Sequence, residues 1–315
     1  MICRILRATA IGDAFGAGYE YAPQDEVAGF TLASGFRQHH KHAEIQPGMW
    51  TDDTMMSIAA ARALVTDMNR QEKPEKKSPR GDTLLQAMVD LHTAHRTAGY
   101  SKHMLAALDG ATTGPELRTI FEGNPRSDSN GAAMRSAIYG VLPSLPRIRD
   151  ATWRLSSLTH QGSGISGAQA VAGAVHFLRY HGGPVSEMKP YLAEWMGALW
   201  TLRWTDRVRP QNGPLGLITV AAALTIVSES QSLTEVIERS IRIGGDVDTV
   251  AAIAMAIACN ASPDDIADDL PPGLWEGEGI VPVAGLEFSA IAALDAEIAA
   301  LAEADGLGLH HEEHE

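Results

Sequence analysis

Apolar residues recur at helical spacing along nearly the whole chain, and this pattern constrains the fold more than any other feature. The repeating residues are Ala, Leu, Ile and Met, whereas strands would show alternating β-branched runs. The sequence therefore predicts an all-α fold, a compact single-domain orthogonal bundle of many helices. The expected helices span residues 4–17, 53–68, 82–97, 101–109, 130–142, 150–158, 163–181, 186–201, 214–228, 232–241, 247–260 and 286–304.

One domain is expected from residue 1 to residue 306, because neither polar connection is long enough to require a boundary. These connections are Asn69–Asp82, rich in Pro, Lys and Glu, and Thr205–Pro214. Residues 307–315 are expected to form a polar, disordered tail. The alternative for this segment is a soft-metal site, since it contains His310, His311 and His314.

Composition excludes several classes of protein. The 315 residues are 45% hydrophobic and 20% charged, which is typical of a soluble globular chain. Acidic residues outnumber basic ones 39 to 25, for a net charge of −14, so binding to a nucleic-acid backbone is not expected. Cys3 and Cys259 are too few for a disulfide framework, and neither a signal peptide nor a membrane span is recognisable. These features predict a cytoplasmic protein.

Two acidic segments each stand directly before an Ala-rich apolar helix. The first contains Thr51, Asp52, Asp53 and Thr54. Thr and Asp are favoured helix N-caps, so a structural role is the alternative for this segment taken alone. One cap residue would be enough, however, and two adjacent carboxylates repel each other.

The second acidic segment favours a metal-binding role over a purely structural one. It places Gly244 and Gly245 before Asp246, Asp248 and Thr249, and the paired glycines allow a sharp turn close to a ligand. Hard cations such as Mg²⁺ or Mn²⁺ prefer several oxygen ligands, and a two-metal site needs a bridging carboxylate. Together the two segments supply such a set of ligands.

Three further segments combine small and polar residues. The first has Gly12, Asp13, Gly16 and Gly18 followed by Glu20, which either packs tightly or admits a ligand. The second, Ser127 to Gly131, precedes an apolar helix; it is either an N-cap or a diphosphate site on free N–H groups, with Asp128 as general base. In the third, His160 is either structural or a hydrogen-bond donor to a phosphate or sugar.

A different group, His39, His40 and His42, is expected to lie on an exposed loop, because its spacing suits no helical zinc motif.

In order, the segments read GD…G…E, WTDDT, NGAAMR, TH and GGDVDT, and between Ile5 and Trp275 they resemble the ADP-ribosylglycohydrolase family. This family includes the dinitrogenase-reductase-activating glycohydrolases and the vertebrate ADP-ribosylhydrolases. The resemblance implies a central cleft with two Mg²⁺ or Mn²⁺ ions. It assigns Thr51, Asp52 and Asp53 to one metal, Asp246 and Thr249 to the other, and Asp248 to both.

The resemblance also implies roles around the metals. Glu20 and Asp128 match catalytic positions, while Ser127, Ser129, Asn130, Gly131, His160, Gly244 and Gly245 are expected to lie against the substrate. The expected activity is metal-dependent hydrolysis of the glycosidic bond between ADP-ribose and an acceptor, either a protein side chain or a small molecule. The alternatives are a non-catalytic ADP-ribose-binding relative and another all-α binuclear or diphosphate-processing enzyme. The last two are disfavoured, because the chain has no His-Asp dipeptide, Asp52 and Asp53 are not followed by an Asp three residues on, and aromatic residues are only 6%.

Overall fold

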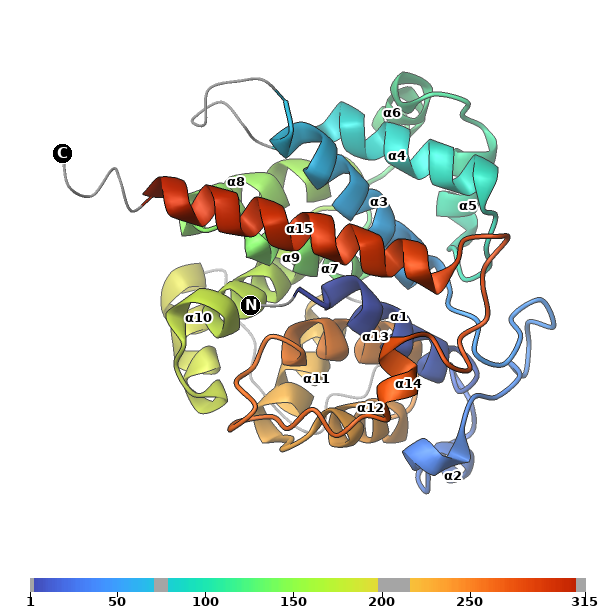
Figure 1. Cartoon of the computed structure of the whole chain (residues 1–315). Coiled ribbons are helices and arrows are strands. Elements are labelled where there is room, and N and C mark those ends of the chain that lie inside the picture. The colour runs from blue at the N-terminus through green and yellow to red at the C-terminus, as the bar shows by residue number, and fades with distance from the viewer. Residues whose placement is uncertain (1–2, 71–78, 198–215, 310–315) are drawn as a thin grey trace.

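The computed structural model describes residues 3–70, 79–197 and 216–309, and within these ranges it is a helical bundle without a β-strand (Figure 1). The all-α prediction is therefore confirmed. The helices are α1 (Ile5–Ala17), α2 (Gln24–Val27), α3 (Asp52–Met68), α4 (Gly81–Ala94), α5 (Lys102–Asp109), α6 (Gly114–Glu122), α7 (Gly131–Met134), α8 (Leu145–Ser156), α9 (Gly162–His176), α10 (Met188–Met196), α11 (Gly216–Glu229), α12 (Leu233–Arg242), α13 (Val247–Ala258), α14 (Pro272–Trp275) and α15 (Phe288–Leu309).

The centre of the bundle is the pair α1 and α13, which make the most extensive contact among the described helices. All twelve residues of α13 are buried. Two glycines on one face of α1 make this contact possible. A Cβ at Gly12 would overlap the carbonyl of Ala251, and a Cβ at Gly16 would overlap the Cα of Asp248. The backbone of α13 therefore lies directly on α1, and this contact fixes the position of Asp248.

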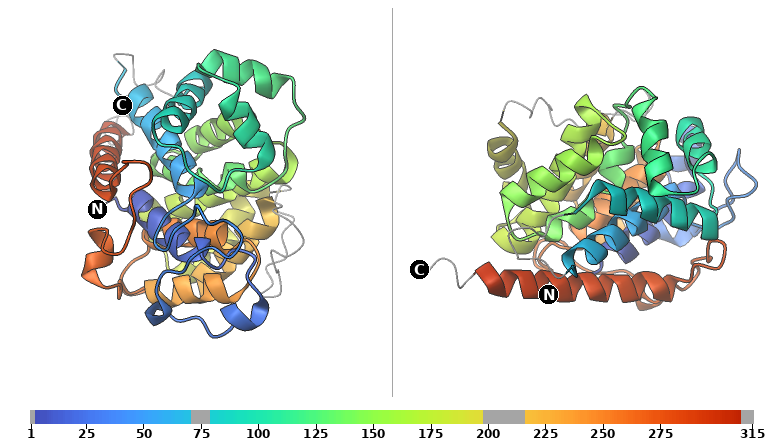
Figure 2. Two further views of the ribbon diagram at one scale, coloured as in Figure 1. Left: turned by 90° about the vertical axis from the view of Figure 1, so that its right-hand side faces the viewer. Right: turned by 90° about the horizontal axis from the view of Figure 1, so that it is seen from above.

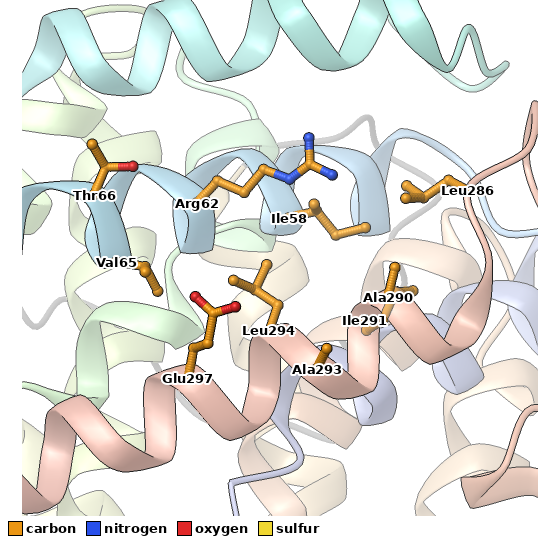
Figure 3. Close-up of a pocket in the computed structure, with 10 residues that line it drawn as sticks. All are labelled: Ile58, Arg62, Val65, Thr66, Leu286, Ala290, Ile291, Ala293, Leu294 and Glu297. Carbon is orange, nitrogen blue, oxygen red and sulfur yellow. The ribbon is translucent and has the colours of Figure 1, made fainter. Parts of the chain in front are cut away.

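The helix α15 crosses the outside of the bundle and packs on α1 and α3 (Figure 2). A groove of about 390 Å³ lies between α3 and α15 (Figure 3). Its walls are mostly aliphatic and also include Arg62, Thr66 and Glu297. The predicted site residues do not line this groove. None of the described helices meets the length and hydropathy of a transmembrane segment.

Several boundaries differ from those expected. The segment 130–142 is not one helix but α7 followed by a 3₁₀ turn at Ala137–Val141. The helix predicted at 150–158 starts earlier, at Leu145, where Pro146 in the first turn costs no hydrogen bond. The helix expected to end at residue 304 continues to Leu309.

One substantial helix, α6, was not predicted. Its start is nevertheless marked by Thr113, whose side chain accepts a hydrogen bond from the Glu116 N–H, and by Pro115 in the first turn. The loop Thr205–Pro214, most of the loop Asn69–Asp82, and His310, His311 and His314 of the predicted tail lie outside the described residues.

Candidate metal centre

Asp13 on α1 caps the N-terminus of α3. Its two carboxylate oxygens accept hydrogen bonds from the backbone N–H groups of Thr51 and Thr54 at 3.0–3.1 Å. They also accept the hydroxyl groups of Thr51 at 2.9 Å and Thr54 at 2.6 Å. Thr51 itself makes no side-chain cap. The local sequence predicted that a side chain of the acidic segment would cap α3, but the cap comes from Asp13 on another helix. The side chains of the acidic segment are therefore not needed to cap α3.

This arrangement determines which atoms of the segment remain available. The Thr51 hydroxyl donates its proton to Asp13, so its lone pairs are open to a cation. Asp53 is 2% exposed, and its Oδ2 accepts the hydroxyl of Thr249 at 3.2 Å. Its Oδ1 is buried without a hydrogen-bond partner. A buried carboxylate oxygen without a donor is costly, and a divalent cation would satisfy it.

The turn before α13 brings the second acidic segment to the same place. Gly244 and Gly245 have φ values of +76° and +86°, which residues with a side chain rarely adopt. The Gly245 carbonyl accepts the backbone N–H of Tyr21 at 2.7 Å, so the turn also holds the segment after α1. Asp246 Oδ2 accepts the amide of Asn130 at 2.7 Å.

Carboxylates from three parts of the chain consequently form one acidic cluster. The oxygens of Asp13, Asp53 and Asp248 lie within 4.8 Å of one another, and so do those of Glu20, Asp246 and Asp248. Asp248 belongs to both groups. Because both oxygens of Asp13 already accept several donors, we assign it to orientation of α3 rather than to cation binding.

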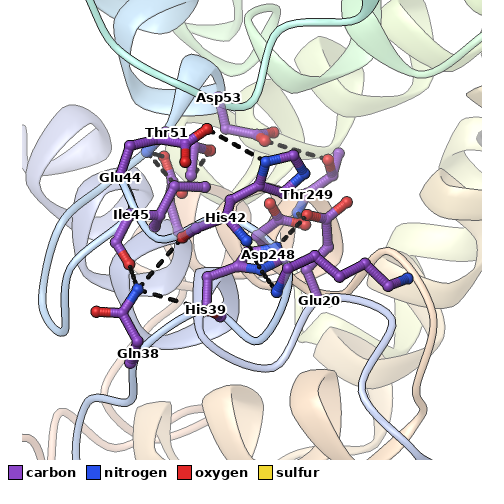
Figure 4. Close-up of polar contacts among 12 residues, drawn as sticks. Glu20, Gln38, His39, His42, Glu44, Ile45, Thr51, Asp53, Asp248 and Thr249 are labelled. Atoms are coloured by element: carbon purple, nitrogen blue, oxygen red, sulfur yellow. Dashed lines mark hydrogen bonds and ion pairs between the residues drawn. The ribbon is translucent and has the colours of Figure 1, made fainter.

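Asp52 is half-buried beside the cluster. The loop after α4 covers it, where Gly99 (φ +101°) comes so close that a Cβ would overlap Asp52 Oδ1. Figure 4 shows several residues of the cluster, with Thr51 and Asp53 on one side and Glu20, Asp248 and Thr249 on the other.

Burial and mutual repulsion raise the pKa values of the acidic cluster. Burial raises the pKa of Asp53 and Asp248 well above the ordinary value, and neighbouring carboxylates raise it further. Burial also raises the pKa of Asp52 and Asp246, and that of Asp13 to about 6 despite its hydrogen bonds to Thr51 and Thr54. The residues present fit hard divalent cations, since positive charge would relieve this repulsion.

A second polar group lies at the start of α7. The His160 ring is buried, and its Nδ1 lies 2.7 Å from the Thr159 hydroxyl oxygen. This oxygen also accepts a hydrogen bond from Nη2 of the buried Arg135. His160 Nε2 lies 3.2 Å from the Ser129 hydroxyl. Burial, and then the charge of Arg135, lower the pKa of His160 to about 3, so the ring is neutral. A Cβ at Gly131 would press on this ring, which explains the glycine at that position.

The structure thus joins some predicted site residues and separates others. Asn130 links the two groups, because it contacts Asp246 and precedes α7. Ser127 and Asp128 lie on the exposed surface of the loop before α7. The main-chain carbonyl of Asp128 accepts Ser163 Oγ and the Gly216 N–H, and its carboxylate belongs to neither acidic group.

Three residues with charged or titratable side chains contact the site and were not predicted as site residues. Asp13 and Arg135 do carry a signal, since a lone charged residue within an apolar helical run needs a buried partner. The third is His39. It was expected to be exposed and is instead buried against Glu20, with Nε2 and Oε2 3.1 Å apart. No local pattern marks it, because the contact depends on how residues 36–45 fold back over α1.

Comparison with known proteins agrees with the fold. A family model described as ADP-ribosylglycohydrolase matches residues 2–259. A solved structure titled "ADP-ribosylglycohydrolase-related protein complex" is similar with a TM-score of 0.65 and 19% sequence identity, over 95% of this chain and 96% of that one. At this identity the likeness shows the fold alone. A search of curated proteins gave no match.

Proposed function

Because the chain belongs to the ADP-ribosylglycohydrolase family, we propose that it is a divalent-cation-dependent hydrolase. It cleaves the glycosidic bond between ADP-ribose and an acceptor and releases ADP-ribose. The observation that carries the cation dependence is the buried, unpaired Oδ1 of Asp53 within a cluster of carboxylates.

The acidic cluster would hold two Mg²⁺ or Mn²⁺ ions. Thr51, Asp52 and Asp53 are assigned to one ion, Asp246 and Thr249 to the other, and Asp248 to both. The membership of Asp248 in both carboxylate groups supports this division. When bound, such ions hold vicinal ribose hydroxyls and polarise a water molecule.

Glu20 is the carboxylate we assign to proton transfer. It lies beside Asp246 and Asp248, yet its side chain retains 22% exposure, so a substrate can reach it. Cleavage of the glycosidic bond passes through an oxocarbenium-like state, which a carboxylate stabilises while it accepts a proton from water. Asp128 is the second candidate base. Its exposed position on the loop before α7 makes it the weaker of the two.

The start of α7 is assigned to the ADP-ribose. Ser129 Oγ accepts from the Ser127 hydroxyl and lies 3.2 Å from His160 Nε2, so this hydroxyl and the neighbouring ring are assigned to the same ligand contact. The backbone N–H groups from Ser129 to Gly131 would lie against the diphosphate. Neutral His160 and the turn at Gly244 and Gly245 complete the proposed substrate contacts.

The partner is an ADP-ribosylated protein or a small molecule that contains ADP-ribose. A net charge of −14 disfavours a nucleic-acid backbone as partner. We propose a cytoplasmic location from the two unpaired cysteines.

The direct test is release of free ADP-ribose from a panel of Arg-linked, Ser-linked and small-molecule substrates, with Mg²⁺, Mn²⁺ or EDTA. Asp248→Asn should abolish release. Asp25→Asn is the matched control, because it makes the same change on the exposed helix α2 and should leave activity unchanged. Cation-dependent release from one linkage would support the proposal and identify the acceptor. Binding of ADP-ribose without release from any substrate would instead favour a non-catalytic binding protein.

Two variants separate the candidate bases. Glu20→Gln should lower kcat by about 10² or more, the usual range for loss of a general base, whereas Asp128→Asn should retain most of its turnover. The opposite result would reassign the base to Asp128.

A further inference from the structure

One histidine of the sequence HHKH is buried, although its neighbours are not. His39 is 4% exposed, whereas His40 and His42 are exposed. The His39 ring points at the acidic cluster, with its Nε2 3.1 Å from Oε2 of Glu20 (Figure 4). A buried imidazole is therefore in contact with a carboxylate of the proposed site.

The loop around His39 determines which ring nitrogen carries the proton. Nδ1 accepts the backbone N–H of Lys41 at 3.0 Å and that of His42 at 3.2 Å. A nitrogen that accepts two N–H groups has no proton of its own, so the proton of the neutral ring is on Nε2. Nε2 then donates to Glu20, because the carboxylate is an acceptor.

The loop is itself held in shape by further contacts. The side-chain amide of Gln38 donates to the carbonyls of His42 at 3.2 Å and Ile45 at 2.6 Å, which closes the turn. The His39 N–H also donates to the Ile45 carbonyl, at 3.4 Å. The ring orientation is therefore set by the loop, independently of Glu20.

Glu20 is held from its other side as well. Tyr21 has a φ of +49°, a strained value for a residue with a side chain, and its N–H is bonded to the Gly245 carbonyl. Gly18 packs so closely on the backbone of Arg37 that a Cβ would overlap its carbonyl oxygen. The loop 37–45 and the segment 18–21 therefore dock as a unit beside Asp246 and Asp248.

We propose that His39 is a positioning residue, whose Nε2–H holds the Glu20 carboxylate towards Asp246 and Asp248 in the orientation needed for turnover. The effect on turnover rests on the proposed function, whereas the tautomer and the contact do not. Residues that orient a reacting or ligating carboxylate in this way commonly change activity by about 10–100-fold when removed. The competing role is purely structural, with His39 serving only to close its own loop through Nδ1.

Two substitutions separate these roles, because each keeps one half of the imidazole. His39→Gln places an amide N–H near the position of Nε2 and loses the acceptor at Nδ1. His39→Asn keeps an acceptor near the position of Nδ1 and loses the donor to Glu20. His103→Gln is the matched control. It makes the same change at an exposed position of α5, whereas the His42 ring packs on the His39 ring, with centroids 4.8 Å apart.

Steady-state release of ADP-ribose should follow the donor to Glu20. His39→Asn should lower kcat at least about 10-fold with KM within about twofold, while His39→Gln should stay within about threefold of the parent in kcat. Equal losses in both variants, or a larger loss in His39→Gln, would overturn the positioning role, since a structural role depends on Nδ1.

A long-range ¹H–¹⁵N correlation spectrum of the full chain tests the inference without activity. The ring signals of His39, assigned by their loss in His39→Asn, should show Nε2 protonated and Nδ1 unprotonated. A protonated Nδ1 would contradict the inference. If the parent protein releases no ADP-ribose, the proposed function fails, and the spectrum still decides whether His39 donates to Glu20.

Discussion

Asp13 shows how one residue organises the first acidic segment. Its carboxylate receives the N–H and hydroxyl groups of Thr51 and Thr54, and so sets the start of α3 and the direction of the Thr51 hydroxyl. An ionised acceptor is well suited to this position at a helix N-terminus. The cation-binding atoms of the proposed centre would thus depend on a residue that we assign to orientation of α3.

Asp13→Asn should therefore lower both stability and cation affinity. The amide would turn an N–H group towards donors that now meet a carboxylate, at a cost of about 2–3 kcal/mol in the free energy of unfolding. Denaturant unfolding and Mn²⁺ titration by calorimetry measure the two effects. Unchanged Mn²⁺ affinity with lowered stability would show that the orientation of Thr51 is unimportant for cation binding.

At the residue scale, sequence was informative for residues that belong to a recognisable motif and uninformative for residues that belong to none. Asp53 and Thr249, far apart in the chain, were assigned to one centre and do lie in hydrogen-bond contact. The expected exposure of His39 was wrong. Its burial depends on Gly18 and Gly245, which bring residues 18–45 and 244–245 together, and no spacing within HHKH encodes that approach.

At the scale of helices, the glycines of α1 control the position of Asp248. Gly16 lies on α1 where α13 begins, and there is no room for a Cβ between it and the Cα of Asp248. Backbone cannot move away as a flexible side chain can, so an added methyl group must push the helices apart.

Gly16→Ala should destabilise the protein by about 1–3 kcal/mol, as overpacking commonly does, and should weaken cation binding by moving Asp248. Gly29→Ala is the control, because nothing lies within 4 Å of the added Cβ and no positive φ opposes it. Thermal unfolding with and without Mn²⁺ gives both quantities. A fully stable Gly16→Ala variant with normal Mn²⁺ affinity would disprove this role of the α1–α13 contact.

The helical character of the segments was predictable because Ala-rich apolar runs at helical spacing do not fit a strand. The residues at which the helices begin and end were less predictable. Pro146 inside the first turn of α8 is an example: proline marks a helix start as well as a helix stop. The missed helix α6 is polar overall and has few buried apolar residues, although its cap is clear.

For the whole molecule, the buried acidic cluster makes stability depend on pH and on cations. Burial raises the pKa of Asp13 from its ordinary value of 3.8 to about 6, and raises the pKa of Asp53 and Asp248 in the same direction. The folded state then binds more protons than the unfolded state. The free energy of unfolding of the metal-free protein must therefore fall as pH rises from about 4 through about 6 and beyond.

The melting temperature of the metal-free protein should accordingly drop by about 5 °C or more between pH 5.5 and pH 8, and Mn²⁺ should restore it at pH 8. Asp248→Asn should flatten the pH dependence, whereas Asp25→Asn, on the surface, should not. A melting temperature that is independent of both pH and Mn²⁺ would contradict the proposed charge state of the cluster.

The most direct test of the central claim is an anomalous difference map from crystals grown with Mn²⁺. It should show two peaks within the acidic cluster, one bounded by Thr51, Asp52 and Asp53 and the other by Asp246 and Thr249, with Asp248 in contact with both. Asp248→Asn crystals grown in the same way should lose at least one peak. Peaks only elsewhere on the molecule, or none in the cluster at saturating Mn²⁺, would contradict the claim that these carboxylates form a divalent-cation centre.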